Sequence, residues 1–213
     1  MKSRILKKIL KNYLFAIAVS AIIAICIRAF VFEAFRIPTD FMAPTIRPGD
    51  HVFTYKLAYH SHSIERGDVI IFSFATDPAK EYIKRVIGVE GDHLEIKAGI
   101  LYLNGKQVTQ ANPKKEENGV EIFDEVLDKK SFKISWLQSN QSAENDSSKN
   151  MISVQVPKGH VFVLGDHRSK GQDSRNWGFL PVSMVKGKAI LIWFSVDPKT
   201  KSIRWDRFFK RLS

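Results

Sequence analysis

The sequence predicts a mainly β domain carried on one N-terminal transmembrane helix. An apolar run of the length that crosses a bilayer follows a basic N-terminus. Most of the remaining chain consists of short apolar or alternating runs separated by Gly, Pro, Asn and Asp, which is the pattern of β-strands joined by turns. The length of 213 residues suits one anchor and one globular domain.

The predicted anchor spans residues 12–33 and follows a basic segment, residues 1–11, that contains no acid. Arg28 interrupts the apolar run, close enough to its end for the side chain to reach the bilayer surface. Because basic flanks stay in the cytoplasm, residues 34–213 are expected outside it. The chain is thus predicted to be a single-pass protein of the cell membrane.

A cleaved signal peptide is the rival interpretation of the same order of charged and apolar residues. Such a peptide ends in a small-x-small cleavage site, but here bulky residues follow the run: Phe30, Val31, Phe32 and Phe35. We therefore predict an uncleaved anchor with phenylalanine rings at the bilayer interface.

The formal net charge of +11, from 33 Lys and Arg against 22 Asp and Glu, indicates a polyanionic partner. The basic residues cluster at both ends of the chain beside apolar or aromatic residues, which favours membrane lipid over nucleic acid. Cys26 is the only cysteine, so no intrachain disulfide or cysteine-based metal site can form. Neither a metal nor another cofactor is expected. Five histidines without metal-ligand spacing are assigned to turns or the surface: His60, His62, His93, His160 and His167.

The predicted strands after the anchor are short and closely spaced. A Gly-Asp turn opens the first, Asp77-Pro78 is expected to end it, and Asn104-Gly105 predicts a tight hairpin. The strands are predicted at Val69–Phe74, Glu81–Val89, His93–Lys97, Ile100–Leu103, Ile152–Pro157, His160–Leu164 and Val185–Phe194.

Residues 111–150 have a different composition and are predicted to be a variable insert within the domain. Two polar stretches, Pro113–Asn118 and Gln138–Asn150, are expected to be exposed loops. Between them, residues 120–123 and 132–136 alternate in polarity, which predicts a peripheral hairpin.

The C-terminal segment, Lys199–Arg211, combines basic residues with Trp205, Phe208 and Phe209. Basic and aromatic residues at helix-like spacing suit adsorption to anionic lipid. The alternative is a solvated chain end whose rings cover the domain, and the short periodicity leaves both interpretations open.

Lys84 lies in an otherwise apolar strand, Tyr82–Gly88. Two-residue alternation places it on the same face as Tyr82 and Val86, with Arg85 on the other. Burial would lower the pKa of this lysine, and a neutral amine is a competent general base. Spacing alone favours a lysine that reaches solvent from an edge strand, which is the more common case.

The extended, proline-rich stretch Phe35–Asp50 contains Ile-Pro-Thr-Asp-Phe-Met-Ala-Pro-Thr-Ile and closes with Gly-Asp. It resembles a segment of the type I signal peptidases, membrane-anchored proteases that use a serine and a lysine to remove signal peptides from exported proteins. Three further stretches resemble segments of that family in the same order along the chain: Arg66–Ile70, Tyr82–Asp92 and Gly165–Gly178.

The resemblance implies a signal peptidase I-like β-domain that takes signal peptides of secreted precursors in an extended groove. It implies Lys84 as general base and Asp173 with Arg175 as the pair that braces the site. It also implies that the Thr39 hydroxyl and the backbone N–H at residue 41 bind the oxyanion. The residues that it places along the substrate are Ile37, Pro38 and Met42.

The chain departs from the family pattern at Phe41, where the resemblance implies the nucleophilic serine. Phenylalanine has no atom that can form an acyl-enzyme. Gly171 stands where many members have a serine that hydrogen-bonds the lysine, and His167 replaces an asparagine, a milder change. Both weaken positioning without removing the reaction itself.

Two functions from different classes follow. One is a signal peptidase I-family protein that is impaired or inactive in cleavage, a pseudoenzyme that still binds precursors or assists an active paralogue. The other is an active endopeptidase with Thr39 as an atypical nucleophile. Thr39 faces the same side as Phe41, but a strand repeat of roughly 6–7 Å displaces its hydroxyl, which disfavours this alternative.

Overall fold

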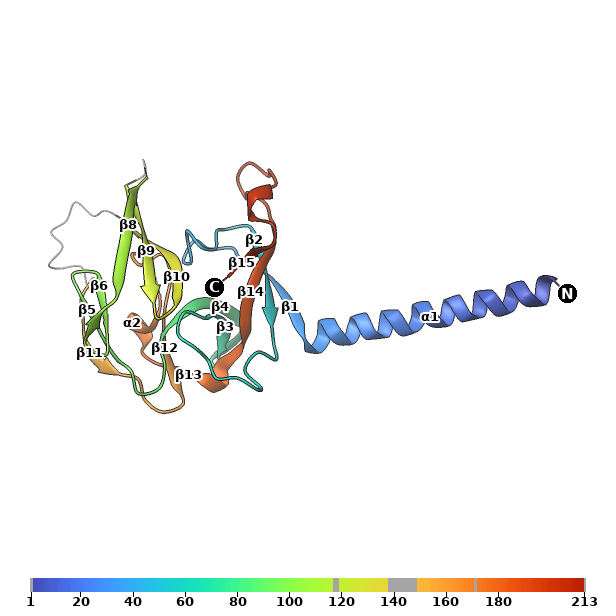
Figure 1. The fold of residues 1–213 in the computed structure, drawn as a ribbon, viewed down its shortest axis with the longest axis horizontal. Helices are drawn as coiled ribbons and strands as arrows, with labels where there is room; N and C mark the ends of the chain where they lie inside the picture. Colours follow the sequence, from blue (N-terminus) through green and yellow to red (C-terminus); the bar gives the residue numbers. More distant parts are fainter. Residues whose placement is uncertain (1, 117–118, 138–148, 171, 213) are drawn as a thin grey trace.

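The computed structural model describes residues 2–116, 119–137, 149–170 and 172–212, with side chains from Lys11 onward. It is mainly β, as predicted, with one long helix that leaves the β domain at its N-terminal end (Figure 1). That helix, α1, spans Lys2–Phe30. Its segment Lys11–Phe30 has a mean hydropathy of 2.3 and none of it is buried, so it is long and apolar enough to cross a membrane.

The helix ends before the anchor was expected to end. Strand β1 (Phe32–Arg36) begins two residues after Phe30 and pairs antiparallel with β2 (Asp50–Tyr55). Phe32 and Glu33, which the sequence placed in the anchor, therefore belong to the sheet, because their backbone groups pair with Tyr55 and Thr54.

The largest sheet is antiparallel and runs in the order β1-β2-β14-β3-β4-β12-β13, with β15 paired to β14. Its remaining strands are β3 (Val69–Phe74), β4 (Asp77–Gly88), β12 (His160–Leu164), β13 (Leu180–Pro181), β14 (Val185–Ser195) and β15 (Lys210–Arg211). The helical turns around it are α2 (Ser174–Trp177), η2 (Val182–Met184) and η3 (Trp205–Arg207).

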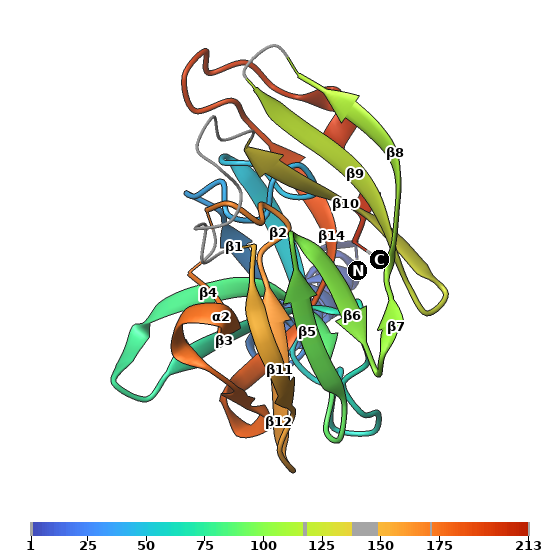
Figure 2. The same cartoon turned by 90° about the vertical axis from the view of Figure 1, so that its left-hand side faces the viewer.

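Two smaller sheets form the other lobe of the domain (Figure 2). One has the order β10-β9-β8 and the other β11-β5-β6-β7. Their strands are β5 (His93–Lys97), β6 (Ile100–Leu103), β7 (Lys106–Gln107), β8 (Thr109–Lys115), β9 (Val120–Leu127), β10 (Lys130–Leu137) and β11 (Met151–Gln155). Asn104 and Gly105 form the tight turn between β6 and β7 with φ values of 52° and 75°, which confirms the predicted hairpin.

Two prolines lie inside strands, one where the sequence predicted the end of a strand and one where it predicted an exposed polar loop. Pro78 belongs to β4, where the register shifts between Phe72 and Phe74 of its partner β3. Pro113 belongs to β8, where the register shifts between Ala111 and Lys114. The prediction was wrong at both places because a bulge leaves a residue outside the ladder, so a missing N–H costs no hydrogen bond.

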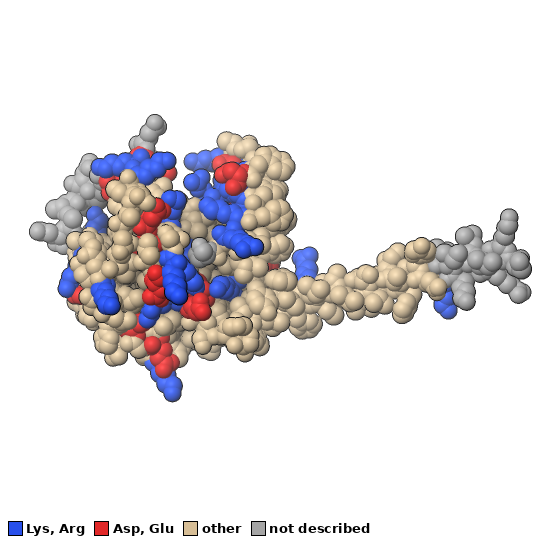
Figure 3. Space-filling view, viewed as in Figure 1, with Lys and Arg blue, Asp and Glu red and all other residues tan. Residues whose placement is uncertain are grey.

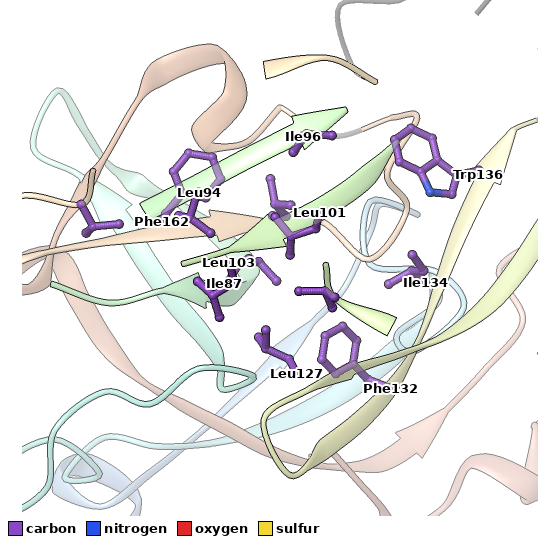
Figure 4. Packing of buried hydrophobic residues seen from close by; sticks show 13 residues of the cluster. Ile87, Leu94, Ile96, Leu101, Leu103, Leu127, Phe132, Ile134, Trp136 and Phe162 are labelled. Carbon is purple, nitrogen blue, oxygen red and sulfur yellow. The ribbon is translucent and has the colours of Figure 1, made fainter. Parts of the chain in front are cut away.

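The hairpin predicted at residues 120–136 exists as β9 and β10, but it is not peripheral. Leu127, Phe132, Ile134 and Trp136 join the largest core cluster, which β5, β6 and β12 also line (Figure 4). Their burial makes this part of the insert an integral layer of the domain. Residues 138–148 of the expected polar loop lie outside the described residues.

The C-terminal segment contains no helix longer than the single turn of η3, and its aromatic residues are not equivalent. Trp205 and Phe209 are each 72% exposed, whereas Phe208 is partly buried and stacks on Trp205. Both earlier interpretations thus retain support, since one ring packs on the domain and two face outward.

Candidate active site

The loop between β1 and β2 is closed by backbone hydrogen bonds at its base. Ile37 N–H donates to the Asp50 carbonyl at 2.9 Å, and Gly49 N–H donates to the Ile37 carbonyl at 2.8 Å. Met42 and Ile46 are 1% and 0% exposed and fix the loop in the core. The buried Met42 thereby fixes the position of its neighbour Phe41 in the loop.

Lys84 reaches this loop from β4. Its side chain is buried, and its Nζ lies 4.8 Å from the centre of the Phe41 ring, a cation–π contact. Gly165 permits this approach, since a Cβ there would lie 2.6 Å from the Phe41 carbonyl oxygen and 3.5 Å from Lys84 Nζ. Three segments distant in sequence therefore converge on one amine.

The pKa of Lys84 is lowered to about 8, chiefly by burial and also by the nearby guanidinium of Arg175, while Asp173 and Asp166 act in the opposite direction. A substantial fraction of the amine is therefore neutral near physiological pH. Lys84 is 2% exposed and does not reach solvent from an edge, which is the case that spacing alone had favoured.

Lys84→Met is expected to raise the free energy of unfolding at pH 7. At about 1.4 kcal/mol per pH unit, the lowering from the ordinary 10.5 to about 8 corresponds to a cost of about 3–4 kcal/mol for the charged amine in the folded chain, which methionine avoids. Below pH 8 both folded and unfolded chains carry the charge, so the cost is complete. Between pH 8 and 10.5 only the unfolded chain holds the proton, so the gain from the substitution shrinks, and above 10.5 it disappears.

Denaturant unfolding of the detergent-solubilised protein across this pH range measures the effect. The matched control is Lys80→Met, an exposed lysine on the same strand, which should change stability by less than about 0.5 kcal/mol. A gain at Lys84 that does not depend on pH would contradict the lowered pKa.

Asp173 and Arg175 form a bidentate ion pair beside Lys84, with both N–O distances 2.8 Å. Asp173 also accepts a hydrogen bond from Gly165 N–H at 3.1 Å and caps the short helix α2. Arg175 donates to the Arg168 carbonyl at 2.7 Å. The pair thus holds residues 165–168 against β4. Gly171, the other residue expected to support the site, lies outside the described residues.

A groove of about 230 Å³ lies alongside Lys84 and Phe41. Ile37, Pro38 and Thr39 line one wall, and residues 80–84 of β4 line the other. Phe35 and Ile71 add apolar surface. Met42 is buried in the core and is not among the lining residues, so it supports the loop from beneath.

Two hydrogen-bond donors face no partner in the described part of the chain. The backbone N–H of Phe41 and the hydroxyl of Thr39 each make no hydrogen bond there, and Thr39 is exposed in the groove. Donors preorganised in this way can stabilise a developing oxyanion.

Sequence reasoning missed a second group of buried charges that holds the site. Arg168 makes two hydrogen bonds to Glu125 of β9, and both side chains are at most 2% exposed. Ser135 of β10 donates through its hydroxyl to the Ala43 carbonyl at 2.9 Å, and its carbonyl accepts from Arg168 N–H at 2.8 Å. No local sequence signal distinguishes Glu125 from the exposed acids around it.

Arg85, next to Lys84 but on the opposite face, forms a further buried pair with Asp166 through two hydrogen bonds of 2.8 Å. The guanidinium lies 3.9 Å from the Phe132 ring centre. The two neighbours on β4 therefore have different roles, since Arg85 fixes the core side of residues 165–168 and Lys84 faces the groove.

His167 was assigned to a turn or the surface, but its side chain is buried, and its backbone N–H donates to the Phe41 carbonyl at 3.1 Å. Burial lowers its pKa. No group of three or more His, Cys, Asp or Glu side chains within the described residues has the arrangement of a metal site.

Comparison with known proteins places these features in a family. The family model "Signal peptidase, peptidase S26" matches residues 10–194. Signal peptidase I of Rickettsia typhi is 33% identical over 86% of this chain and 78% of its own length. The probable signal peptidase I-1 of Synechocystis sp. is 32% identical over 83% of this chain and 78% of its own length.

Among solved structures, the crystal structure of a signal peptidase I from Enterococcus faecalis V583 is similar, with 27% identity and a TM-score of 0.37 over 60% of this chain and 97% of that one. The family model covers most of the chain, including β1, the loop with Phe41, Lys84 and the Asp173–Arg175 pair. The chain therefore belongs to the signal peptidase I family.

Proposed function

We propose that this protein binds signal peptides of exported precursors without cleaving them. The observation that carries the proposal is the Phe41 ring, which lies against the Lys84 amine at the position where the family's nucleophile is expected. A ring supplies neither an oxygen nor a sulfur atom for acyl transfer. The lysine, its bracing ion pair and the groove are nevertheless retained.

The sheet leaves room for an extended peptide beside the groove. β1 is an edge strand, and β12 pairs with β4 only at Arg85, Val86 and Gly88 within the described residues. The preceding half of β4 therefore has a free edge that faces the groove. A peptide that adds here as a strand gains backbone hydrogen bonds, with apolar side-chain contacts from Ile37 and Ile71.

The protein is proposed to work at the membrane surface. The apolar segment of α1 anchors it, and the basic residues before the segment keep the N-terminus in the cytoplasm, so the groove lies outside. Exposed Trp205 and Phe209, close to basic residues of the C-terminal segment, suit contact with anionic lipid. An active signal peptidase in the same membrane is the partner that would cleave a delivered precursor.

The full chain in detergent is expected to bind a fluorescent signal peptide with an Ala-x-Ala end and to leave an intact precursor uncut after hours of incubation. Fluorescence anisotropy measures binding, and mass spectrometry of the precursor detects cleavage. A variant in the groove lining tests whether the peptide binds there. Tyr82→Ala is unsuitable because Tyr82 packs against the core, so Lys80→Glu is used, since Lys80 is exposed and lines the groove.

Cleavage by the natural protein that Lys84→Ala abolishes would overturn the proposal. In that case Thr39→Ala becomes the next variant, because the Thr39 hydroxyl also lines the groove. Absence of both binding and cleavage would contradict a role in signal-peptide recognition altogether.

A further inference from the structure

A second recess lies on the other side of the Phe41 loop. Its volume is about 560 Å³, within the range of ligand pockets. The space-filling view shows a hollow between the lobe of β8–β10 and the lobe of β14, with Lys and Arg atoms along it (Figure 3). Its lining comes from residues 40–48, from β9 and β10 with Glu116, from the segment with His167 and Lys170, and from the segment after β14.

The recess is adjacent to the signal-peptide groove through the loop itself. Asp40 lines the recess, whereas its neighbours Thr39 and Phe41 line the groove. The same division occurs on the facing segment, where Lys170 lines the recess and Gln172 lines the groove. A polypeptide that runs along the groove and continues past Phe41 therefore meets the recess next.

Two cations in the recess have no side-chain partner among the described residues. Arg47 and Lys199 are both exposed and unpaired there, while Lys170 pairs with Asp40 at 2.6 Å and Arg204 with Asp197 at 3.1 Å. Burial lowers the pKa of His167, which also lines the recess, so its ring adds no charge at neutral pH. Arg and Lys side chains in the lining outnumber the acids, which are Asp40, Glu116 and Asp197, so the net charge of the recess is positive.

We infer that this recess binds the part of an exported precursor that follows the signal peptide, and that it favours Asp or Glu in that segment. The inference rests on the proposed binding of signal peptides in the groove. Arg47 is able to take a carboxylate in a bidentate contact, and Lys199 adds a second, flexible cation. Residues beyond the signal peptide thereby contribute to which precursors are held.

The test compares three peptides on the full chain in detergent by fluorescence anisotropy. The first ends at the Ala-x-Ala sequence, the second continues for six residues that include Asp and Glu, and the third carries Lys in place of these acids. The acidic extension is expected to tighten binding about fivefold over the short peptide, and this gain should shrink as salt is raised. The lysine extension should give no gain.

Arg47→Glu combined with Lys199→Glu should abolish the gain from the acidic extension and leave binding of the short peptide unchanged. Lys106→Glu is a control for the reversal of an exposed charge, since it lies on β7, outside the lining of both pockets, and should retain the gain. If the acidic extension does not tighten binding, or if the gain survives the double reversal, the inference about the recess is wrong while the proposed function stands. Failure of the short peptide to bind overturns the proposed function separately, and failure of every peptide overturns both.

Discussion

Phe41→Ser is expected to give this protein signal-peptide cleavage that exceeds the natural chain by about a thousandfold or more, because loss of a serine nucleophile costs other serine proteases a factor of that size or larger. The substitution places a hydroxyl on the loop that already faces Lys84 and removes the ring from the amine. The lowered pKa of Lys84 provides the base, and the free N–H of residue 41 with the Thr39 hydroxyl provides oxyanion donors. Cleavage of a precursor with an Ala-x-Ala site, followed by mass spectrometry, measures the gain.

Two controls separate the chemistry from the opening of the groove. Phe41→Ala removes the ring without adding a hydroxyl, so it should expose Lys84 and remain silent. Lys84→Ala in the Phe41→Ser background should abolish the cleavage that was gained. Since the base acts in its neutral form, the rate of Phe41→Ser should rise as pH is raised through the pKa of Lys84, and then level off. That pKa should lie above the value of about 8 in the natural chain, because removal of the ring reduces the burial that lowers it. A silent Phe41→Ser with intact peptide binding would show that more than the nucleophile separates this chain from an active enzyme.

The parts of the fold that follow from local pattern were predictable, and those that follow from packing between sheets were not. Alternation placed Lys84 on the same strand face as Tyr82 and Val86, and Asn104-Gly105 specified a hairpin, because both depend on neighbours in sequence. The hairpin of β9 and β10 was also predicted from alternation. The contact between this hairpin and the Phe41 loop was not predicted, because alternation identifies a face of a strand without identifying the layer that covers it.

The residues of the site also divide into those that the sequence identified and those that it did not. The resemblance identified Lys84, Asp173 and Arg175, and the structure brings these three together around Gly165. Glu125 has no such signal, since it is one acid among several in a polar insert. Its importance arises only from Arg168, which comes from a distant segment and is buried against it.

Glu125→Ala is expected to lower the free energy of unfolding by about 3–5 kcal/mol, a large part of the total stability of a domain of this size. The substitution leaves the Arg168 guanidinium buried at 2% exposure without its carboxylate. The effect should extend to the site, because Arg168 also receives Arg175 on its carbonyl and donates its N–H to Ser135. Denaturant unfolding of the full chain in detergent measures the loss.

Asp124→Ala is the matched control, because Asp124 is the adjacent acid on β9 and its partner Lys133 is exposed to solvent. An exposed pair of this kind contributes about 1 kcal/mol or less. The double variant Glu125→Leu with Arg168→Met should recover most of the stability, since the cost arises from an unpaired buried charge and not from loss of attraction. If Glu125→Ala and Asp124→Ala are equally mild, the Glu125–Arg168 pair does not brace the site, and the positions of residues 165–168 must depend on the Arg85–Asp166 and Asp173–Arg175 pairs alone.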